Sequence, residues 1–319
     1  MYKLLFTITI CFFTICELAA EDTKRRHYQV NILHDIFEFN EHSKKSVKLD
    51  DLYQGCPRVD CIPSIDNPEF MLVKENDFMN DDDVTMTVFY NGIRKVYPRK
   101  ILQLHEIVND YFADKPLAVT YCPLCGSAVA FIPIIDGERV ELGVSGLLHN
   151  SDLVMYDRKT QSLWGQITGT AIVGSKTGDR LSAVNVSLSR WKHIKNKYPK
   201  ALLLAPPGGH AEHYNRFRYQ HYTQSESLIF PVNATDTRLA AKAFVFGIEI
   251  DGMHFAYEES YLVKHSPVIE SFADRVLRIT IDDVGEVIAK DKKTGETFNV
   301  LRNYWFAWYA FYPKTYLRK

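Results

Sequence analysis

The chain lacks an excess of charge of either sign, and it lacks long hydrophobic runs after residue 20. Lys and Arg together number 38 and Asp and Glu 39, so the formal net charge is −1 at pH 7. This balance gives no electrostatic reason to expect nucleic acid or an acidic membrane surface as a partner. No later segment reaches transmembrane length, so we also expect no stable membrane span.

Cysteine is scarce, with six residues in 319. Lys3, an apolar run over 4–16 and small residues at Ala19 and Ala20 have the layout of a secretory signal peptide. The run is too short for a comfortable membrane span. We therefore predict a signal peptide over 1–20 and a secreted or extracytoplasmic protein; an uncleaved anchor is the alternative. Two of the six cysteines, Cys11 and Cys16, lie in this segment.

The full chain has 46% hydrophobic and 13% aromatic residues, so the part after residue 20 is rich enough in apolar residues to form a large core. We expect a lead-in segment over 21–55, with little core of its own, and a main domain over 56–319. The sequons at Asn185 and Asn233 predict N-glycosylation if the host is a eukaryote.

The chain also lacks the strand–helix alternation of a doubly wound sheet. Asn91-Gly92 and Asp251-Gly252 each stand between alternating apolar residues, which predicts two β-hairpins. Helical periodicity follows the first hairpin over 99–112, and a short helix follows the second. Segments 84–112 and 242–262 therefore resemble each other and predict an internal duplication. We expect a β-dominated α+β fold, with two related hairpin-plus-helix halves packed in one compact unit.

The segment "CPLCG" (122–126) stands between two predicted strands. A thioredoxin-like site is disfavoured, because there the motif opens a helix. The segment matches a metal knuckle, which supplies two ligands. A closed zinc site needs four ligands, and no second C-x-x-C occurs in the chain to supply the other two. A redox-active pair and plain structural bridging are the alternatives for Cys122 and Cys125. Cys56 and Cys61 are close enough in sequence for a local disulfide.

Five stretches resemble a known family: "HEIVND" (105–110), "VTYCPLCGSAVAF" (119–131), the block over 143–174, "FPV" (230–232) and "WFAWYAFYP" (305–313). On these motifs the chain, from about Asp60 to Pro313, is identified as a member of the family known as domain of unknown function 3179. The resemblance implies no activity, because the family has none assigned. The chain departs from the family pattern over 208–224, which carries three histidines: His210, His213 and His221. A transition-metal site or an ordinary surface loop would account for them.

The block over 143–174 holds many polar groups for an apolar chain. A lined pocket is one interpretation, with candidate residues Asn150, Ser151, Asp152, Asp157, Arg158, Trp164 and Gln166. An Asx-type turn at 150–152 and an ion pair between Asp157 and Arg158 are the alternative. If the block folds against the cysteine motif, a soft ligand set suited to copper or zinc would result, made of His105, Cys122, Cys125, His149 and Met155.

These patterns leave two classes of function open. The first is an exported metal-binding or thiol-based redox protein centred on "CPLCG", with a metal ion or a small molecule as its partner. The second is a non-catalytic extracellular binding module with structural disulfides. Acid–base hydrolysis by Asp152, Asp157 or Glu106 has no spacing signature, so the sequence leaves open whether the protein is an enzyme. The aromatic segment 303–313 suits a core-anchoring terminus better than a ligand platform.

Overall fold

The computed structural model describes residues 28–272 and 274–319. The predicted signal peptide over 1–20 lies outside the described residues. None of the helices in the described ranges is both long and apolar enough to cross a membrane. Strands dominate the fold and helices are short, which confirms the β-dominated α+β prediction. The α-helices are α2 (Arg99–Leu102), α3 (Trp191–Lys197), α4 (Gln220–Gln224), α5 (Glu259–His265) and α6 (Trp305–Phe311).

The strands form six sheets in the described part of the chain. One sheet has the order β15 (Ser187–Arg190), β3 (Val84–Tyr90), β4 (Ile93–Pro98), β16 (Leu202–Leu204), β2 (Phe70–Leu72). A second has the order β23 (Val300–Tyr304), β17 (Phe244–Ile250), β18 (Met253–Glu258), β24 (Tyr316–Arg318). A third has the order β14 (Ser182–Val184), β7 (Ser127–Ile132), β6 (Lys115–Cys122), β5 (Ile107–Phe112).

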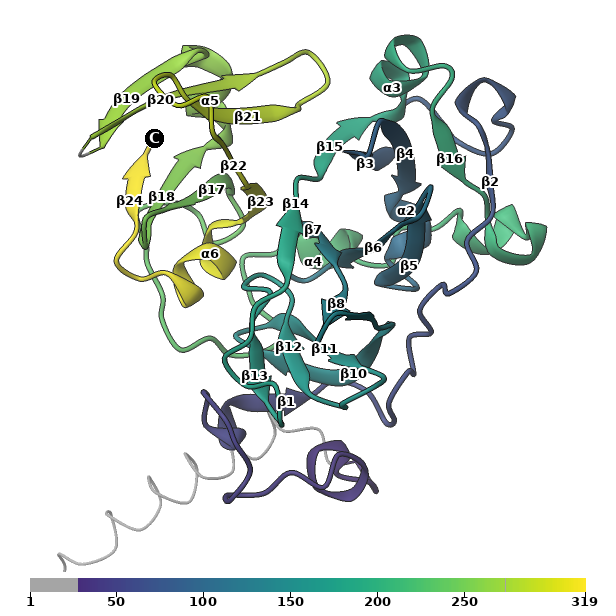
Figure 1. The fold of residues 1–319 in the computed structure, drawn as a ribbon. Helices are drawn as coiled ribbons and strands as arrows, with labels where there is room; N and C mark the ends of the chain where they lie inside the picture. Colours follow the sequence, from purple (N-terminus) through teal and green to yellow (C-terminus); the bar gives the residue numbers. More distant parts are fainter. Residues whose placement is uncertain (1–27, 273) are drawn as a thin grey trace, which may run out of the picture.

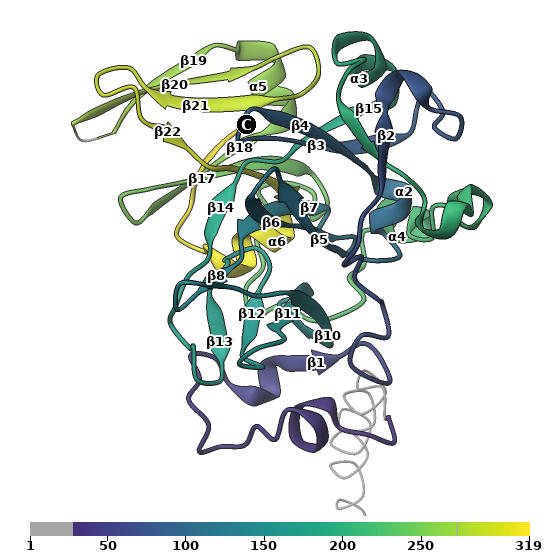
Figure 2. The ribbon, with the colours of Figure 1, turned by 45° about the vertical axis from the view of Figure 1, so that its right-hand side comes forward.

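The fourth sheet has the order β1 (Leu52–Gln54), β10 (Leu142–His149), β11 (Asp152–Asp157), β12 (Leu163–Gly165), β13 (Ala171–Val173). The fifth has the order β19 (Val268–Phe272), β20 (Arg275–Ile281), β21 (Val287–Asp291), β22 (Thr297–Phe298), and β8 (Ile134–Ile135) pairs with β9 (Glu138–Arg139). Figure 1 and Figure 2 show the fourth sheet at one end of the molecule and the sheets of β3 and β17 toward the other.

The sheets of β3 and β17 share one connectivity. In each, a hairpin leads into a short helix, a later strand pairs antiparallel with the first hairpin strand, and a last strand pairs parallel with the second. A tryptophan opens the helix before that last strand in both: Trp191 donates its backbone N–H to Asp83 O, and Trp305 donates to Ala243 O. This shared order supports the internal duplication, which stays a prediction.

The helix predicted over 99–112 is wrong beyond its first turn. Helix α2 ends at Leu102, and Ile107–Phe112 forms strand β5 paired with β6. Glu106 between them has a φ of 57°, which a helix does not allow. Strand β5 is buried on both faces, so its apolar residues do not alternate and are easily read as helical.

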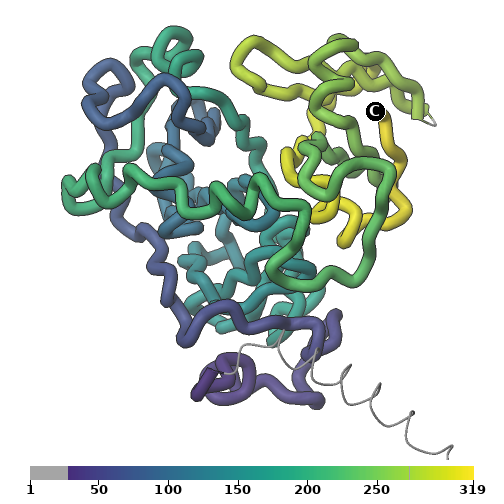
Figure 3. The backbone as a smooth tube through the Cα atoms, turned by 180° about the vertical axis from the view of Figure 1, so that it is seen from behind, coloured from purple at the N-terminus to yellow at the C-terminus, as the bar shows by residue number. Residues whose placement is uncertain are grey.

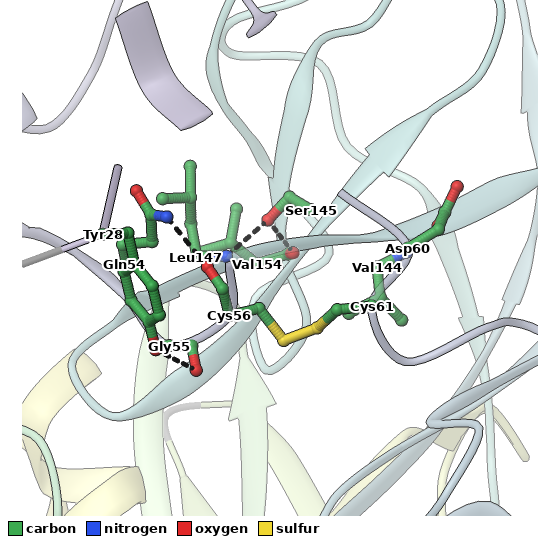
Figure 4. Close-up of a disulfide and its surroundings, with 10 residues drawn as sticks. All are labelled: Tyr28, Gln54, Gly55, Cys56, Asp60, Cys61, Val144, Ser145, Leu147 and Val154. Carbon is green, nitrogen blue, oxygen red and sulfur yellow. Dashed lines mark hydrogen bonds between the residues drawn. A yellow bond between two sulfur atoms is a disulfide. The ribbon is translucent and has the colours of Figure 1, made fainter. Parts of the chain in front are cut away.

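The lead-in segment packs into the body of the protein. Ile32, Leu33 and Phe37 are buried against the sheet of β10 and β11. Figure 4 shows the disulfide that joins Cys56 and Cys61, whose Cα atoms are 6.2 Å apart, beside strand β10. That separation lies in the usual range for a disulfide, and the predicted local bridge is confirmed.

Strands β6 and β7 separate two apolar cores. Val119 and Tyr121 face the core beneath the β3–β4 hairpin, whereas Ala118 and Cys122 face the core shared with β10 and β11. This alternation follows from the two-residue period of a strand. It directs the cysteine motif toward the block over 143–174.

Candidate metal centre

The two cysteines lie in the tight turn between β6 and β7, as the sequence predicts. Cys122 ends β6, and Gly126, with a φ of 60°, precedes the first residue of β7. The Cys125 carbonyl accepts the Tyr304 N–H at 2.8 Å, and the Leu124 carbonyl accepts the Tyr222 hydroxyl at 3.0 Å. Both thiols are buried and free. Hydrogen bonds from Tyr304 and Tyr222 therefore stabilise the turn, and no disulfide joins its two sulfur atoms.

A second hairpin turn, between β10 and β11, meets this motif. Asn150 and Ser151 both have positive φ, 52° and 63°, the conformation of a tight two-residue hairpin turn. The Ser151 carbonyl oxygen lies 3.3 Å from Cys125 Sγ and 4.0 Å from Cys122 Sγ. The next residue is Asp152, so its carboxylate also reaches the two thiols.

Cys122, Cys125 and Asp152 form a compact ligand group. One atom from each, two sulfurs and a carboxylate oxygen, lies within 4.8 Å of the others. Ligands of a tetrahedral zinc ion, at about 2.0–2.3 Å from the metal, lie about 3.3–3.8 Å apart. A single ion could therefore bind all three after a small contraction.

The two carboxylate oxygens of Asp152 differ in their hydrogen bonding. Its Oδ2 accepts the Ile167 N–H at 2.9 Å, whereas Oδ1 is buried with no hydrogen-bond donor from N–H or O–H groups of the described residues. The thiols of Cys125 and Cys122 are its polar neighbours. Buried carboxylate oxygens are normally satisfied, so this one has a free capacity to bind a cation.

Burial favours the uncharged form of each group in the metal-free protein. Loss of hydration raises the pKa of both thiols and raises that of Asp152 to about 7. Glu106, next to the group, has its pKa raised to about 8 by burial and by the charge of Asp152. A cation would reverse this preference, because it stabilises thiolates and carboxylates.

A cavity of about 230 Å³ adjoins the group and is lined by Glu106 and Cys122. Its other walls are mainly apolar, with Leu124, Leu148 and Phe230 among them. The Glu106 carboxylate makes no hydrogen bond within the described chain. Figure 3 shows the segment that contributes Phe230, in green, crossing from the unit of β3 to that of β17.

The structure does not assemble the predicted soft ligand set. Both ring nitrogens of His105 are engaged, Nδ1 with Pro63 O at 2.8 Å and Nε2 with the Tyr214 hydroxyl at 2.9 Å. His149 ends β10 and packs edge-on against Phe311, outside the ligand group. Met155 is buried in the apolar core that also holds the cysteines.

The candidate pocket residues belong to separate groups. Asp157 accepts the indole N–H of Trp164 at 2.9 Å, and Gln166 bonds Ser127 in the core. Asn150 Oδ1 accepts the backbone N–H of Asn233 at 2.8 Å.

The ion pair proposed between Asp157 and Arg158 is wrong. The Arg158 guanidinium instead contacts Asp66 and Glu141, both at 2.8 Å. Asp157, the last residue of β11, is buried, whereas Arg158 follows the strand in a turn and its side chain is partly exposed.

The histidines over 208–224 lie on the surface. His210, Glu212 and His213 bring ligand atoms together but are all exposed, and His221 is outside that group. The aromatic segment 303–313 forms α6 and buries Trp305, Phe306 and Trp308, so it anchors the core as expected.

Sequence reasoning named Asp152 as a pocket residue and missed that its carboxylate adjoins the two cysteines. It found no spacing signature for Glu106, although this carboxyl is buried beside the same group. The one local signal for Asp152 was an acidic residue at the start of an otherwise apolar strand, directly after a turn.

Neither the curated proteins nor the solved structures contain a match to this chain. A family of related sequences, described as Protein of unknown function (DUF3179), matches residues 59–302. The match includes the cysteine turn, the β10–β11 hairpin and the block on which the resemblance was based. The chain therefore belongs to this family of proteins of unknown function.

Proposed function

We propose that the protein binds a transition-metal ion, zinc, through Cys122, Cys125 and Asp152. The observation that carries this proposal is the buried Asp152 Oδ1, which accepts no N–H or O–H from the described residues and adjoins two free thiols. Thiolate and carboxylate are both ligands of zinc in proteins. Copper(I) prefers softer sets of thiolate and thioether, and the histidines of the predicted copper set lie outside this group.

Three protein ligands leave one position open on a tetrahedral ion. Closed structural zinc sites use four protein ligands, whereas sites that act on small molecules keep one for water or substrate. Cys122 lines the adjoining cavity, so that side gives a small molecule access to the metal. Glu106 lines the same cavity, so its carboxyl group can hold a proton beside the metal position.

A thiol-based redox function is the second candidate, and burial argues against it. Attack on a disulfide requires a thiolate, and the raised pKa values of both cysteines keep them protonated. A non-catalytic binding module remains compatible with the apolar cavity. The bridge between Cys56 and Cys61 fits the predicted export, because disulfides persist in oxidising compartments.

The test is elemental analysis of protein exported from a host with an oxidising secretory compartment. We expect about one zinc per chain, lost in Cys122→Ser and weakened in Asp152→Asn. Asp136→Asn, which removes an exposed carboxylate, is the matched control and should keep the metal. An inability of the reduced protein to bind zinc, or an isolated Cys122–Cys125 disulfide, would overturn the proposal.

A further inference from the structure

A second cavity, of about 420 Å³, lies where the β3 and β17 units meet. It is lined by residues of both hairpin sheets and by the outer side of the cysteine turn, including Arg99, Tyr121, Gly126, Arg302 and Tyr304. The cavity is distinct from the one beside Glu106, with no lining residue in common.

Arg99 is the unpaired charge of this cavity. Arg302 makes a bidentate ion pair with Glu259, at 2.8 and 2.9 Å, and Arg190 pairs with Asp82 at 2.8 Å. The Arg99 guanidinium has no ion pair or hydrogen bond to any residue that the structure describes. It lies over the ring of Phe217, 4.1 Å from the centroid, which orients the group without neutralising it.

Comparison of the two units shows why Arg99 lacks an ion pair within the described part of the chain. Arg99 and Glu259 each open the helix that directly follows the hairpin. In the second unit, Phe246 of the hairpin is opposite Arg302, which binds Glu259.

In the first unit, the residue opposite the hairpin at the corresponding place is Leu188, paired with Met86. An ion pair like that of the second unit therefore cannot form. One positive charge of the first unit stays uncompensated at the edge of a cavity.

Two hydroxyl groups complete the polar lining. Neither Tyr121 nor Tyr304 donates its phenol O–H to a described residue, and the positive charges of Arg99 and Arg302 act on both hydroxyls. A neutral phenol is a hydrogen-bond donor. The rings of Phe244 and Tyr304, with centroids 4.6 Å apart and planes tilted by 34°, add an aromatic wall.

We propose that this cavity binds a small anionic ligand through its carboxylate or phosphate group. Arg99 supplies the charge and the hydroxyls of Tyr121 and Tyr304 donate hydrogen bonds to the anion. Because the guanidinium presents a planar fork of donors, it suits both anion types. The aromatic wall accommodates an apolar part of the ligand. This proposal does not depend on the metal centre.

The experiment is calorimetric titration of the full exported chain with inorganic phosphate and with benzoate, at constant ionic strength set by chloride. We expect saturable binding of at least one probe, and which probe binds identifies the anion type. Arg99→Gln should weaken that binding at least about tenfold, since it removes the one unpaired charge. Arg180→Gln, which removes an ion-paired arginine outside this cavity, is the control and should bind as the wild type does.

Tyr121→Phe provides a second test if Arg99→Gln folds poorly by circular dichroism. It removes one donor and keeps the ring, so we expect weaker binding of the same probe. The proposal is overturned if neither probe binds saturably, or if a folded Arg99→Gln or Tyr121→Phe protein binds with unchanged affinity.

Discussion

Asp152→Asn should stabilise the metal-free protein at alkaline pH while reducing its stabilisation by zinc. The asparagine side chain keeps an oxygen that can accept the Ile167 N–H, so the hydrogen bond of Asp152 Oδ2 is preserved. The variant removes the ionisable carboxyl from a site where burial opposes its charge. If Asp152 is a metal ligand, its buried carboxyl lowers the stability of the metal-free protein and is stabilised only when the metal is bound.

The magnitude follows from the pKa of Asp152, which rises from its ordinary value of 3.8 to about 7 in the folded protein. Between these values the folded state binds the proton and the unfolded state has lost it, so the free energy of unfolding falls as pH rises. Each pKa unit corresponds to about 1.4 kcal/mol, so the loss approaches about 4 kcal/mol once the pH passes the folded value. Asp152→Asn has no carboxyl at this position, so its free energy of unfolding does not fall with pH for this reason.

The assay is urea unfolding in the presence of a chelator, from about pH 5 to about pH 8. The free energy of unfolding of Asp152→Asn, relative to wild type, should increase over this range by about 2–4 kcal/mol. Asp136→Asn should show no such trend, because that side chain is exposed. Added zinc should stabilise the wild type more than it stabilises Asp152→Asn, whose zinc binding is weakened. A constant difference between variant and wild type at all pH values would refute the reasoning.

Three further predictions concern other parts of the fold. Asp110→Ala leaves its buried lysine partner without a counter-ion and should cost about 3–5 kcal/mol in urea unfolding; a loss below about 1 kcal/mol would contradict this. In a eukaryotic secretory host, Asn233→Gln should remove a glycan detectable by gel mobility, because Asn233 is exposed. Asn185→Gln should change gel mobility less, because Asn185 is only partly exposed and lines a cavity; a larger shift from Asn185→Gln than from Asn233→Gln would contradict this. Gly247→Ala places a Cβ 2.2 Å from an indole carbon of Trp308 and should lower stability by about 1–3 kcal/mol, measured by thermal unfolding, whereas an unchanged midpoint would mean that the ring moves freely.

Local turn chemistry made parts of this fold predictable. Asn91-Gly92 and Asp251-Gly252 both adopt positive φ at two successive residues, which few other residue pairs tolerate. The hairpins on either side of them were therefore predicted correctly, as was the turn that holds Cys122 and Cys125. Each of these features depends on residues within a few positions of one another.

Periodicity failed where burial removed it. Strand β5 is covered on both faces, so Ile107 and Val108 are both fully buried, and its polar residues Asn109 and Asp110 are buried too and mark no outer side. Its apolar spacing then matches a helix as well as a strand. The positive φ of Glu106, which ends the helix, has no signature in the residue type, because glutamate seldom takes this conformation.

The sequence by itself determined the β-dominated fold, the local disulfide, the cysteine turn and the family. Only the tertiary structure decided that Asp152 lies beside Cys122 and Cys125, that His105 does not, and that Arg99 has no ion pair or hydrogen bond to a described residue. The physical reason is the distance along the chain over which each kind of interaction acts. Turn and strand preferences act over neighbouring residues, whereas these groups meet through the packing of one sheet on another, and the free energy of that packing is spread over many apolar side chains rather than encoded in any motif.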